Sequence, residues 1–340
     1  MDNNYTLNIK DQSKVCIGSA GELLKQLLPQ GRVIVISDIN IDRLYHPLIS
    51  RFESILIGTG ETIKTLTTME KIYSQLVEMG ADRKTFILGI GGGIVTDIAG
   101  FVASTYMRGV KFGFISTTLL SQVDAGVGGK NGVNLGGYKN MIGTFNQPEF
   151  VICDVDMLKT LSDREFRTGL AEVIKSAIIA DPALFDMLEQ TSLEELRENR
   201  ELLSRAIMAS VTVKAKIVEM DEREAGERRK LNLGHTFAHA IEKSSNLMNH
   251  GEAVAVGTNI VTDISIKLGI IDTTTAERIN ALHIKMGFDL TSPVEPRKLL
   301  KAISHDKKAE EGVIYMVLPR AIGDCEVRKM TFSEVEKLVG

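Results

Sequence analysis

Short apolar runs rich in β-branched residues alternate with amphipathic stretches along the first half of the chain. The strand-like runs occupy residues 31–37, 54–57, 84–90, 110–116 and 150–154. The run at 54–57 leads into a Gly58-Thr-Gly60 turn and a predicted helix, and the run at 84–90 ends in three glycines. Continuous apolar strands separated by helical segments are typical of a parallel sheet covered on both faces. We therefore predict an N-terminal α/β domain.

The pattern changes at Leu161. Ser162-Asp-Arg-Glu165 is a capping-box sequence that predicts the start of a helix, and the pattern stays helical to about residue 310. Long helices are predicted at 194–218 and 251–268, and residues 312–318 and 325–327 predict a small hairpin. A chain of 340 residues exceeds the size at which single cores stop growing. We predict two domains, residues 1–161 and 162–340.

The composition is that of an ordinary globular protein, with 44% hydrophobic and 25% charged residues. A net charge of -4 and a pI near 6.0 give no reason to expect nucleic acid or an anionic membrane as a partner. The polar N-terminus predicts no signal peptide, and no apolar run approaches the roughly 20 residues that span a bilayer. Three widely separated cysteines argue against a disulfide framework and favour a reducing cytoplasm.

Histidines are concentrated in one segment, which holds three of the six: His235, His239 and His250. Histidine is the commonest metal ligand. Upstream, Glu172 is a candidate carboxylate ligand, and two imidazoles with one carboxylate form the ligand set of open catalytic zinc sites. This crowding in a histidine-poor chain indicates chemistry rather than packing.

Helical geometry leaves simpler interpretations open for each piece. At 100° per residue, Glu172 and Lys175 lie opposite the apolar side of their predicted helix. On this helix alone we expect a solvated i,i+3 ion pair worth about 0.2–0.5 kcal/mol. His235, His239 and Glu242 share one face of a second helix, and such a histidine pair also fits solvated or hydrogen-bonded imidazoles. Metal binding is the favoured hypothesis only because the pieces occur together.

A glycine-rich segment, Gly91-Gly92-Gly93, follows a strand and opens a helix. Backbone N–H groups and the helix dipole there would point at an anion such as a pyrophosphate. The spacing departs from G-x-G-x-x-G because Ile94 occupies the position of the third glycine. A tight turn without a ligand is therefore an equally good interpretation. Asp38, at the end of an earlier strand, suits a ribose diol, although aspartates are common in loops.

Lysines occur in two segments that we predict to be glycine-rich loops, residues 124–130 and 136–140. Glycine allows a ligand to approach the backbone closely, and the lysine ammonium binds phosphate and carboxylate groups. Lys130 and Lys139 therefore favour a phosphorylated, carboxylated small molecule as ligand. Solvation is the simpler interpretation of the other candidate cations, which are Arg108, Lys214, Arg228, Lys307 and Lys308.

Together these segments closely resemble the 3-dehydroquinate synthase family over nearly the whole chain, from residue 38 to residue 324. In the first half the matching motifs are Gly91-Gly-Gly-Ile-Val-Thr-Asp97, Thr105-Tyr-Met-Arg108-Gly, Thr117-Thr118-Leu-Leu-Ser-Gln-Val-Asp124, Val127-Gly-Gly-Lys130 and Lys139-Asn140-Met-Ile-Gly. In the second half they are Gly169-Leu-Ala-Glu172-Val-Ile-Lys175, Leu231-Asn232-Leu-Gly-His235, His250-Gly-Glu and Asp306-Lys307-Lys308. The resemblance implies a Rossmann-like NAD domain, an α-helical metal domain and an active site in the cleft between them.

The resemblance also implies the reaction. Family members convert 3-deoxy-D-arabino-heptulosonate 7-phosphate into 3-dehydroquinate and phosphate in the shikimate pathway. NAD+ oxidises the C5 hydroxyl, and the hydride is returned after phosphate has left. A divalent metal, zinc or cobalt, binds the C4 and C5 hydroxyls and lowers the pKa of the one being oxidised. The substrate phosphate takes the C6 proton, so no dedicated base is required.

The family's functional residues carry over by position. The implied metal ligands are Glu172, His235 and His250. The implied phosphate ligands are Lys130, Asn140, Asn232 and His239, with Arg108 reaching in from the second subunit of a homodimer. The implied carboxylate ligands are Arg228 with Lys307 or Lys308, and the implied ligands of the ring hydroxyls are Lys175 and Lys214. The residues expected to act in catalysis are Asp124, Lys130, Lys175, Lys214 and His239.

The implied NAD-binding positions are Asp38, Asn40, Glu61, Lys64, Gly91, Gly92, Gly93, Asp97, Thr117, Thr118, Asp124, Lys130 and Lys139. The acidic Asp38 favours NAD over NADP because a 2′-phosphate would meet like charge. The chain departs from the common family pattern at several positions that are not ligands. One is Thr96, which replaces a glycine and must therefore avoid positive φ.

Three alternatives remain at this point. A sibling sugar-phosphate cyclase that makes an inosose or a valiolone has no substrate carboxylate, so Arg228 and residues 306–308 favour 3-dehydroquinate synthase. A metal-dependent polyol dehydrogenase would accumulate NADH and would not need Lys130, Lys139 and Arg108 around a phosphate. A catalytically inactive binding protein would have no need of every expected ligand.

Overall fold

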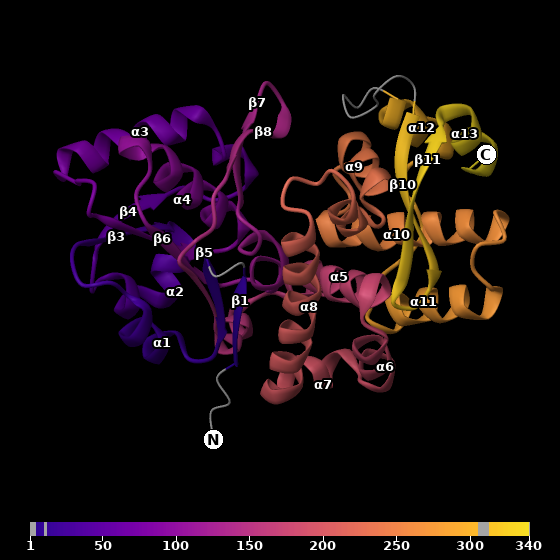
Figure 1. Cartoon of the computed structure of the whole chain (residues 1–340), viewed down its shortest axis with the longest axis horizontal. Helices are drawn as coiled ribbons and strands as arrows, with labels where there is room; N and C mark the ends of the chain where they lie inside the picture. The colour runs from indigo at the N-terminus through magenta and orange to yellow at the C-terminus, as the bar shows by residue number, and fades with distance from the viewer. Residues whose placement is uncertain (1–4, 10–11, 305–312, 340) are drawn as a thin grey trace. The chain divides into compact units, whose positions relative to one another are not determined.

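The computed structural model describes residues 5–9, 12–304 and 313–339. The chain divides into two compact units, residues 1–161 and 162–340 (Figure 1). Two of the predicted carboxylate-binding residues, Lys307 and Lys308, lie outside the described residues. Among the residues that are described, no helix has the length and apolar character needed to cross a membrane.

The N-terminal unit is built on a seven-stranded sheet with the strand order β1-β2-β9-β6-β5-β3-β4. The strands are β1 (Tyr5–Ile9), β2 (Ser13–Ile17), β3 (Val33–Asp38), β4 (Glu53–Ile57), β5 (Phe86–Gly91), β6 (Phe112–Ser116) and β9 (Phe150–Cys153). β1 pairs antiparallel with β2, and the other neighbouring strands pair parallel. All five strands predicted from the apolar runs are present; β1 and β2 were not predicted.

Helices cover both faces of this sheet. They are α1 (Ala20–Leu27), α2 (Ile39–Ile49), α3 (Leu66–Glu78) and α4 (Gly93–Thr105). On β5, Leu88 and Ile90 belong to a buried cluster that includes residues of α1 and α2. Gly89 lies between them and faces α4, because a Cβ atom there would stand 2.9 Å from the Cβ of Ala99. The two covered faces explain why these strands read as uninterrupted apolar runs.

A two-stranded antiparallel ribbon, β7 (Lys130–Leu135) and β8 (Tyr138–Phe145), belongs to the same unit. Its turn is Gly136-Gly137, with φ values of 58° and 82°. A two-residue hairpin needs this left-handed backbone region, which glycine enters at no steric cost. The loop predicted at residues 136–140 is therefore wrong beyond the turn, because the glycine pair joins two strands.

The C-terminal unit is mainly helical. Its helices are α5 (Asp163–Ala180), α6 (Pro182–Gln190), α7 (Leu193–Glu198), α8 (Arg200–Met220), α9 (His235–Ser244), α10 (His250–Lys267), α11 (Thr273–Lys285), α12 (Pro296–Ser304) and α13 (Phe332–Val339). The predicted terminal hairpin is present as β10 (Val313–Ala321) and β11 (Asp324–Thr331). The predicted capping residue Ser162 begins α5, since its hydroxyl accepts from the Glu165 N–H at 3.2 Å.

The single helix predicted at 194–218 is wrong. It is interrupted at Asn199, whose side chain accepts a hydrogen bond from the Leu202 N–H at 3.1 Å and caps α8. Asparagine offers the backbone this alternative partner, and apolar periodicity cannot detect it. The break separates the short α7 from the long α8.

Close packing of α5 against α10 positions the candidate metal ligands. Every residue of α5 from Thr168 to Ile179 is buried. At the start of α10, a Cβ atom on Gly251 would come within 2.5 Å of the Thr168 Cα, so only glycine allows this approach. Asn249 and Glu252 form a reciprocal capping box that fixes the first turn of α10. His250, the first residue of α10, is thereby held beside α5.

The three cysteines, Cys16, Cys153 and Cys325, are buried unpaired thiols. Burial raises the pKa of Cys153, and it raises the pKa of Cys325 to about 12. Thiols with such pKa values are protonated at neutral pH and react slowly.

We predict that the buried His283 makes the fold sensitive to acid. Its Nδ1 lies 2.9 Å from the Ile279 carbonyl, and burial lowers the pKa of His283 to about 4. The unfolded histidine binds its proton near 6.5, so the unfolded state gains protons first as the pH falls. The contribution of His283 to the free energy of unfolding is therefore fully present above about pH 6.5. It falls by about 3 kcal/mol as the pH decreases to 4.

The test compares urea unfolding of the unmodified protein and of His283→Leu at pH 7 and pH 4.5. The other titrating groups are present in both proteins, so their contribution cancels in the comparison. Between pH 7 and pH 4.5, we expect the free energy of unfolding to fall by about 2 kcal/mol less in the variant than in the unmodified protein. An identical loss in both proteins would show that His283 is not responsible.

Candidate metal centre and nucleotide site

Three side chains of the C-terminal unit converge on one point. One ligand atom from each of Glu172, His235 and His250 lies within 4.8 Å of the other two. Glu172 comes from the middle of α5, and the two histidines are the first residues of α9 and α10. The Glu172 Oε1 lies 3.6 Å from the His235 Nε2 and 3.4 Å from the His250 Nε2. Glu172 is more than 60 positions from either histidine in the chain, yet the three residues present their donor atoms together.

The second nitrogen of each imidazole faces an acceptor. His235 Nδ1 lies 3.1 Å from the carbonyl oxygen of Leu233, and His250 Nδ1 lies 3.6 Å from the Glu242 Oε2. An acceptor at Nδ1 favours the tautomer in which Nε2 carries the lone pair. Both histidines therefore direct Nε2 toward Glu172. Glu242 was predicted to lie on the histidine face but was assigned no role; its position seven residues after His235, on the same helix face, was the available signal.

Glu172 and Lys175 are not the solvated pair predicted from their helix alone. They are 1% and 3% exposed, and they form a buried ion pair. Burial alone would raise the pKa of Glu172, but the positive charge of Lys175, and next the interactions with the two histidines, hold it well below its usual value. Glu172 is therefore ionised, which is the form that a metal requires.

The histidines differ in charge preference. Burial, followed by the charge of Lys175, lowers the pKa of His235 to about 3. Burial also acts on His250, but contact with Glu172 and Glu242 raises its pKa to about 9.

This donor set fits a divalent cation. Lys175 pairs with the Glu172 Oε2, whereas the buried Glu172 Oε1 faces the two imidazoles, where it can act as a ligand. Two imidazole nitrogens and one carboxylate are the protein ligands of open catalytic zinc sites. His239 lies beside the cluster on α9, its ring 5.6 Å from that of His235 at an interplanar angle of 85°.

The predicted substrate residues of the C-terminal unit occupy a constrained segment before α9. Asp221 accepts backbone hydrogen bonds from Gly226, Ala225 and Arg228 at 2.7 to 3.0 Å, which lowers the pKa of Asp221 to about 2. Arg228 is only 2% exposed, and its Nη1 donates to the Glu222 carbonyl at 2.5 Å.

Two further predicted ligands flank this segment. Asn232 Nδ2 donates to Glu224 Oε1 at 2.5 Å, and Glu224 adopts a positive φ of 63°. Lys214, on α8, is 7% exposed. The segment thus holds an arginine and an amide in fixed positions, as binding of an anionic group requires.

In the N-terminal unit, the glycine segment leads into α4 as predicted. Gly92 is the N-cap of α4 and makes no side-chain cap hydrogen bond. A Cβ on Gly92 would come within 2.9 Å of the Thr118 Cγ2, so the backbone lies close to this threonine. The neighbouring Thr117 Oγ1 is buried without a hydrogen-bond partner among the described residues. An uncapped helix N-terminus beside an orphaned hydroxyl fits a phosphate-bearing nucleotide.

A buried lysine links several of the predicted NAD positions. Lys64 is 4% exposed, and its ammonium pairs with Asp97 of α4 and donates to the Asn140 Oδ1 at 2.6 Å. Burial is the main influence on Asp97 and raises its pKa to about 6, although Lys64 acts in the opposite direction. Thr96, the departure from the family glycine, lies inside α4 and donates to the Gly93 carbonyl at 3.0 Å.

Other predicted residues of this unit are less tightly placed. Asp38 caps α2, since its Oδ1 accepts from Asn40 and Ile41 at 2.8 and 3.0 Å, so one oxygen has a structural role. Arg108 is exposed with φ of 72°, next to Met107 with φ of 49°. Lys130 and Lys139 are exposed on the β7–β8 ribbon, and Asp124 lies in the short π-helix Ser121–Ala125.

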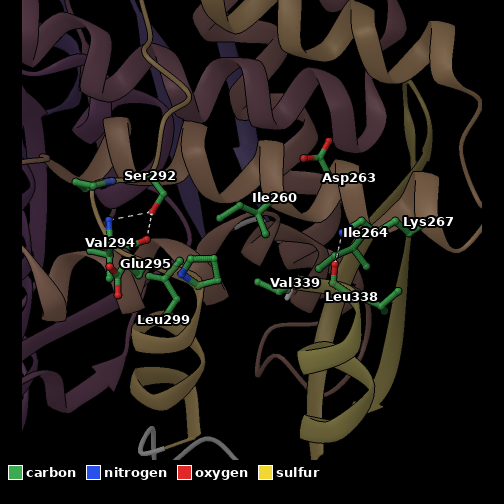
Figure 2. Close-up of a pocket in the computed structure, with 12 residues that line it drawn as sticks. Ile260, Asp263, Ile264, Lys267, Ser292, Val294, Glu295, Leu299, Leu338 and Val339 are labelled. Atoms are coloured by element: carbon green, nitrogen blue, oxygen red, sulfur yellow. Dashed lines mark hydrogen bonds between the residues drawn. The ribbon is translucent and has the colours of Figure 1, made fainter.

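A separate pocket of about 340 Å³ lies near the C-terminal end of α10 (Figure 2). Aliphatic side chains such as Ile260, Ile264 and Leu299 dominate its lining, and the Lys267 Nζ donates to the Leu338 carbonyl at 2.5 Å. Asp263, which also lines it, is thirteen residues beyond His250, or roughly 20 Å along the helix. No predicted site residue contributes to this pocket.

Family models match most of the chain. The 3-dehydroquinate synthase N-terminal model matches residues 54–168, and the 3-dehydroquinate synthase C-terminal model matches residues 169–309. The chain belongs to the 3-dehydroquinate synthase family. Similarity to individual relatives agrees. A 3-dehydroquinate synthase of Dehalococcoides mccartyi is 41% identical over 92% of this chain and 91% of its own length. One of Halorhodospira halophila is 42% identical, with 90% and 88% covered.

Solved structures of other sugar-phosphate cyclases are similar to this 3-dehydroquinate synthase family member. ValA, a 2-epi-5-epi-valiolone synthase from Streptomyces hygroscopicus with NAD+ and Zn2+ bound, has a TM-score of 0.86 and 27% identity, covering 96% of this chain and 95% of its own. A 2-deoxy-scyllo-inosose synthase complexed with carbaglucose-6-phosphate, NAD+ and Co2+ has a TM-score of 0.90, with 99% of each chain covered. At 22% identity, the second likeness shows the fold alone.

These similarities confirm the predicted family and fold class, a Rossmann-like sheet unit followed by a helical unit. The sibling cyclases, which were an alternative, are related by structure, whereas the relatives at about 40% identity are 3-dehydroquinate synthases. A glycerol dehydrogenase from Schizosaccharomyces pombe has a TM-score of 0.66 at 15% identity and shares only the fold.

Proposed function

We propose that this enzyme converts 3-deoxy-D-arabino-heptulosonate 7-phosphate into 3-dehydroquinate and phosphate, as a phosphate-eliminating cyclase of aromatic amino acid biosynthesis. Family membership over residues 54–309 supports the reaction. The observation that carries the chemistry is the convergence of Glu172, His235 and His250 within 4.8 Å. That donor set suits a cation that binds a vicinal diol.

Glu172, His235 and His250 would hold one divalent metal, zinc or cobalt. When bound, the metal lowers the pKa of a coordinated hydroxyl and so favours its oxidation. Lys175 forms an ion pair with Glu172 and would donate to a ring hydroxyl of the substrate. Lys214 would do the same from α8, and His239 would bind the phosphate beside the cluster.

NAD+ would bind the N-terminal unit and accept and return one hydride per turnover. The N-terminus of α4, with Gly91, Gly92 and Gly93, would bind the pyrophosphate through backbone N–H groups. The remaining proposed NAD positions are Asp38, Asn40, Glu61, Lys64, Asp97, Thr117, Thr118, Asp124, Lys130 and Lys139.

Substrate anions would be recognised by fixed cations and amides. Arg228, with Lys307 or Lys308, would bind the carboxylate, which distinguishes this substrate from those of the sibling cyclases. Lys130, Asn140 and Asn232 would bind the phosphate.

We also propose a homodimer in which one subunit's Arg108 reaches the phosphate bound to the other. The exposure of Arg108 and its left-handed backbone, φ 72°, support a special role for this residue. The three unpaired thiols support a reducing cytoplasm as the site of action.

The decisive assay incubates the purified enzyme with the heptulosonate phosphate, NAD+ and zinc or cobalt. We expect continuous release of inorganic phosphate and no net absorbance of NADH at 340 nm, because the hydride is returned within each cycle. Stoichiometric NADH would instead indicate a polyol dehydrogenase. Phosphate release from a hexose 6-phosphate or a heptulose 7-phosphate without a carboxylate, and none from the heptulosonate, would indicate a sibling cyclase.

A further inference from the structure

We propose that Asn134 is a positioning residue that fixes Glu61, Lys64 and Asn140 in the arrangement that binds NAD and the substrate phosphate. The inference rests on the proposed function, which assigns Glu61 and Lys64 to NAD and Asn140 to phosphate. Asn134 itself has no role in that assignment. It lies on β7, one residue before the strand ends at the Gly136-Gly137 turn.

Three hydrogen bonds radiate from Asn134, one to each of these residues. Its side-chain Nδ2 donates to the Glu61 Oε1 at 2.8 Å. Its side-chain Oδ1 accepts from the Asn140 N–H at 2.9 Å. Its backbone N–H donates to the Lys64 carbonyl at 2.8 Å. Both functional ends of the Asn134 amide are therefore used, and both are directed at proposed ligand-binding residues.

The bond to Asn140 stabilises an uncommon backbone conformation. Asn140 adopts φ of 53°, in the left-handed region that non-glycine residues rarely enter. This conformation lets Asn140 Oδ1 accept from the Lys64 ammonium at 2.6 Å while its N–H reaches Asn134. Lys64 in turn pairs with Asp97, so one connected network runs from Glu61 to α4.

The bond to Glu61 fixes a carboxylate that interacts with the like charge of Asp97. Glu61 interacts unfavourably with Asp97, and Asp97 also with Asp124, while Lys64 is the nearby cation. The Asn134 amide donates to Glu61 without adding charge, so it holds the carboxylate in place and leaves Lys64 to Asp97. Aspartate is nearly the same size as asparagine but cannot donate in its ionised form. The substitution Asn134→Asp therefore replaces the hydrogen bond to Glu61 by repulsion between two carboxylates, with little change in side-chain size.

The test measures the dissociation constant of NAD+ for the metal-loaded, full-length protein by calorimetry at pH 8 and pH 5.5. We expect Asn134→Ala to weaken NAD+ binding about tenfold at both pH values, since it removes a hydrogen bond to a charged group. Asn134→Asp should weaken binding at least as much at pH 8. The introduced carboxylate also places a second negative charge beside Glu61, so this variant should bind NAD+ no better than Asn134→Ala does.

A matched control is Asn146→Ala. Asn146 lies just beyond the other end of the ribbon, and its side chain donates at 3.0 Å to the hydroxyl of Ser104, a residue with no proposed role in ligand binding. We expect NAD+ affinity within about twofold of the unmodified protein. Comparing each variant with the unmodified protein at the same pH removes the contribution of Asp97, which titrates in all of them.

The outcomes separate this inference from the proposed function. Unmodified protein that releases phosphate without net NADH supports the function independently of any variant. If, in that case, both Asn134 variants bind NAD+ as the unmodified protein does, the positioning role is wrong and the function stands. An Asn134→Asp variant that binds NAD+ as tightly as the unmodified protein at pH 8 would also overturn it, because an ionised carboxylate cannot donate to Glu61. Failure of the unmodified protein to bind NAD+ would overturn both.

Discussion

Replacing His250 by alanine is expected to leave the purified protein without its divalent metal while the fold persists. His250 supplies one of three converging ligand atoms, and its Nε2 lies 3.4 Å from Glu172. Loss of a residue that only orients a ligand weakens metal binding about 10- to 100-fold, so loss of a ligand should weaken it by more than about 100-fold. Elemental analysis after dialysis measures the metal content, and the phosphate-release assay should report activity near background.

His46→Ala provides the matched control for this variant. His46 is an exposed histidine of α2 that contacts Asp42 at 3.0 Å, so its loss removes an imidazole without touching the cluster. We expect full metal content and unchanged phosphate release. Retention of metal by His250→Ala, with the circular dichroism of the unmodified protein, would refute the ligand assignment. Circular dichroism would show whether His250→Ala fails to fold. In that case the metal content of His250→Gln is measured instead.

Replacing Lys64 by methionine is expected to destabilise the N-terminal unit by about 3–5 kcal/mol, the usual effect of removing one partner of a buried ion pair. The ammonium of Lys64 is the partner of Asp97, and the two side chains are 5% and 17% exposed. Burial already raises the pKa of Asp97 to about 6. Without Lys64 that pKa should rise further, because the opposing positive charge is gone.

Urea unfolding followed by circular dichroism measures this loss of stability. The direction in which the loss changes with pH tests the role of Asp97. A carboxyl whose folded pKa lies above its unfolded value of 3.8 binds more protons in the folded state, so stability falls as the pH rises through that interval. The deficit of Lys64→Met should therefore be larger at pH 8 than at pH 5. Adding Asp97→Asn should recover part of it at pH 8. Deficits that are equal at both pH values would contradict the assigned role of Asp97.

The sheet could be predicted from the sequence because burial on both faces leaves a direct trace in composition. The runs at 84–90 and 110–116 are apolar at nearly every position, and they became the central strands β5 and β6. The β7–β8 ribbon was harder to predict from the sequence. Most of β8 is exposed, so its apolar side chains do not alternate in the pattern typical of a half-buried strand. The glycine pair was interpreted as part of a loop, whereas it forms a hairpin turn.

The candidate site was predictable in its members but not in its environment. Motif resemblance identified Glu172, and helical geometry separated it from the apolar side of α5. Helical geometry alone predicted that Glu172 and Lys175 would be exposed to solvent, whereas both side chains are buried. A single helix cannot reveal what packs on its polar side. For the same reason, hydrogen bonds between distant segments, such as Asn134 to Glu61, have no periodic signal in the sequence.

The inaccessibility of Cys16, Cys153 and Cys325 makes this protein convenient for site-specific labelling. Their exposed fractions are 2%, 0% and 2%, so a maleimide reagent at neutral pH has no native thiol to attack. A cysteine introduced at an exposed position, such as Val77 on α3 or Leu247 before α10, becomes the sole reactive group. A fluorophore attached there reports on one unit at a time, in an enzyme that contains no tryptophan to compete with it.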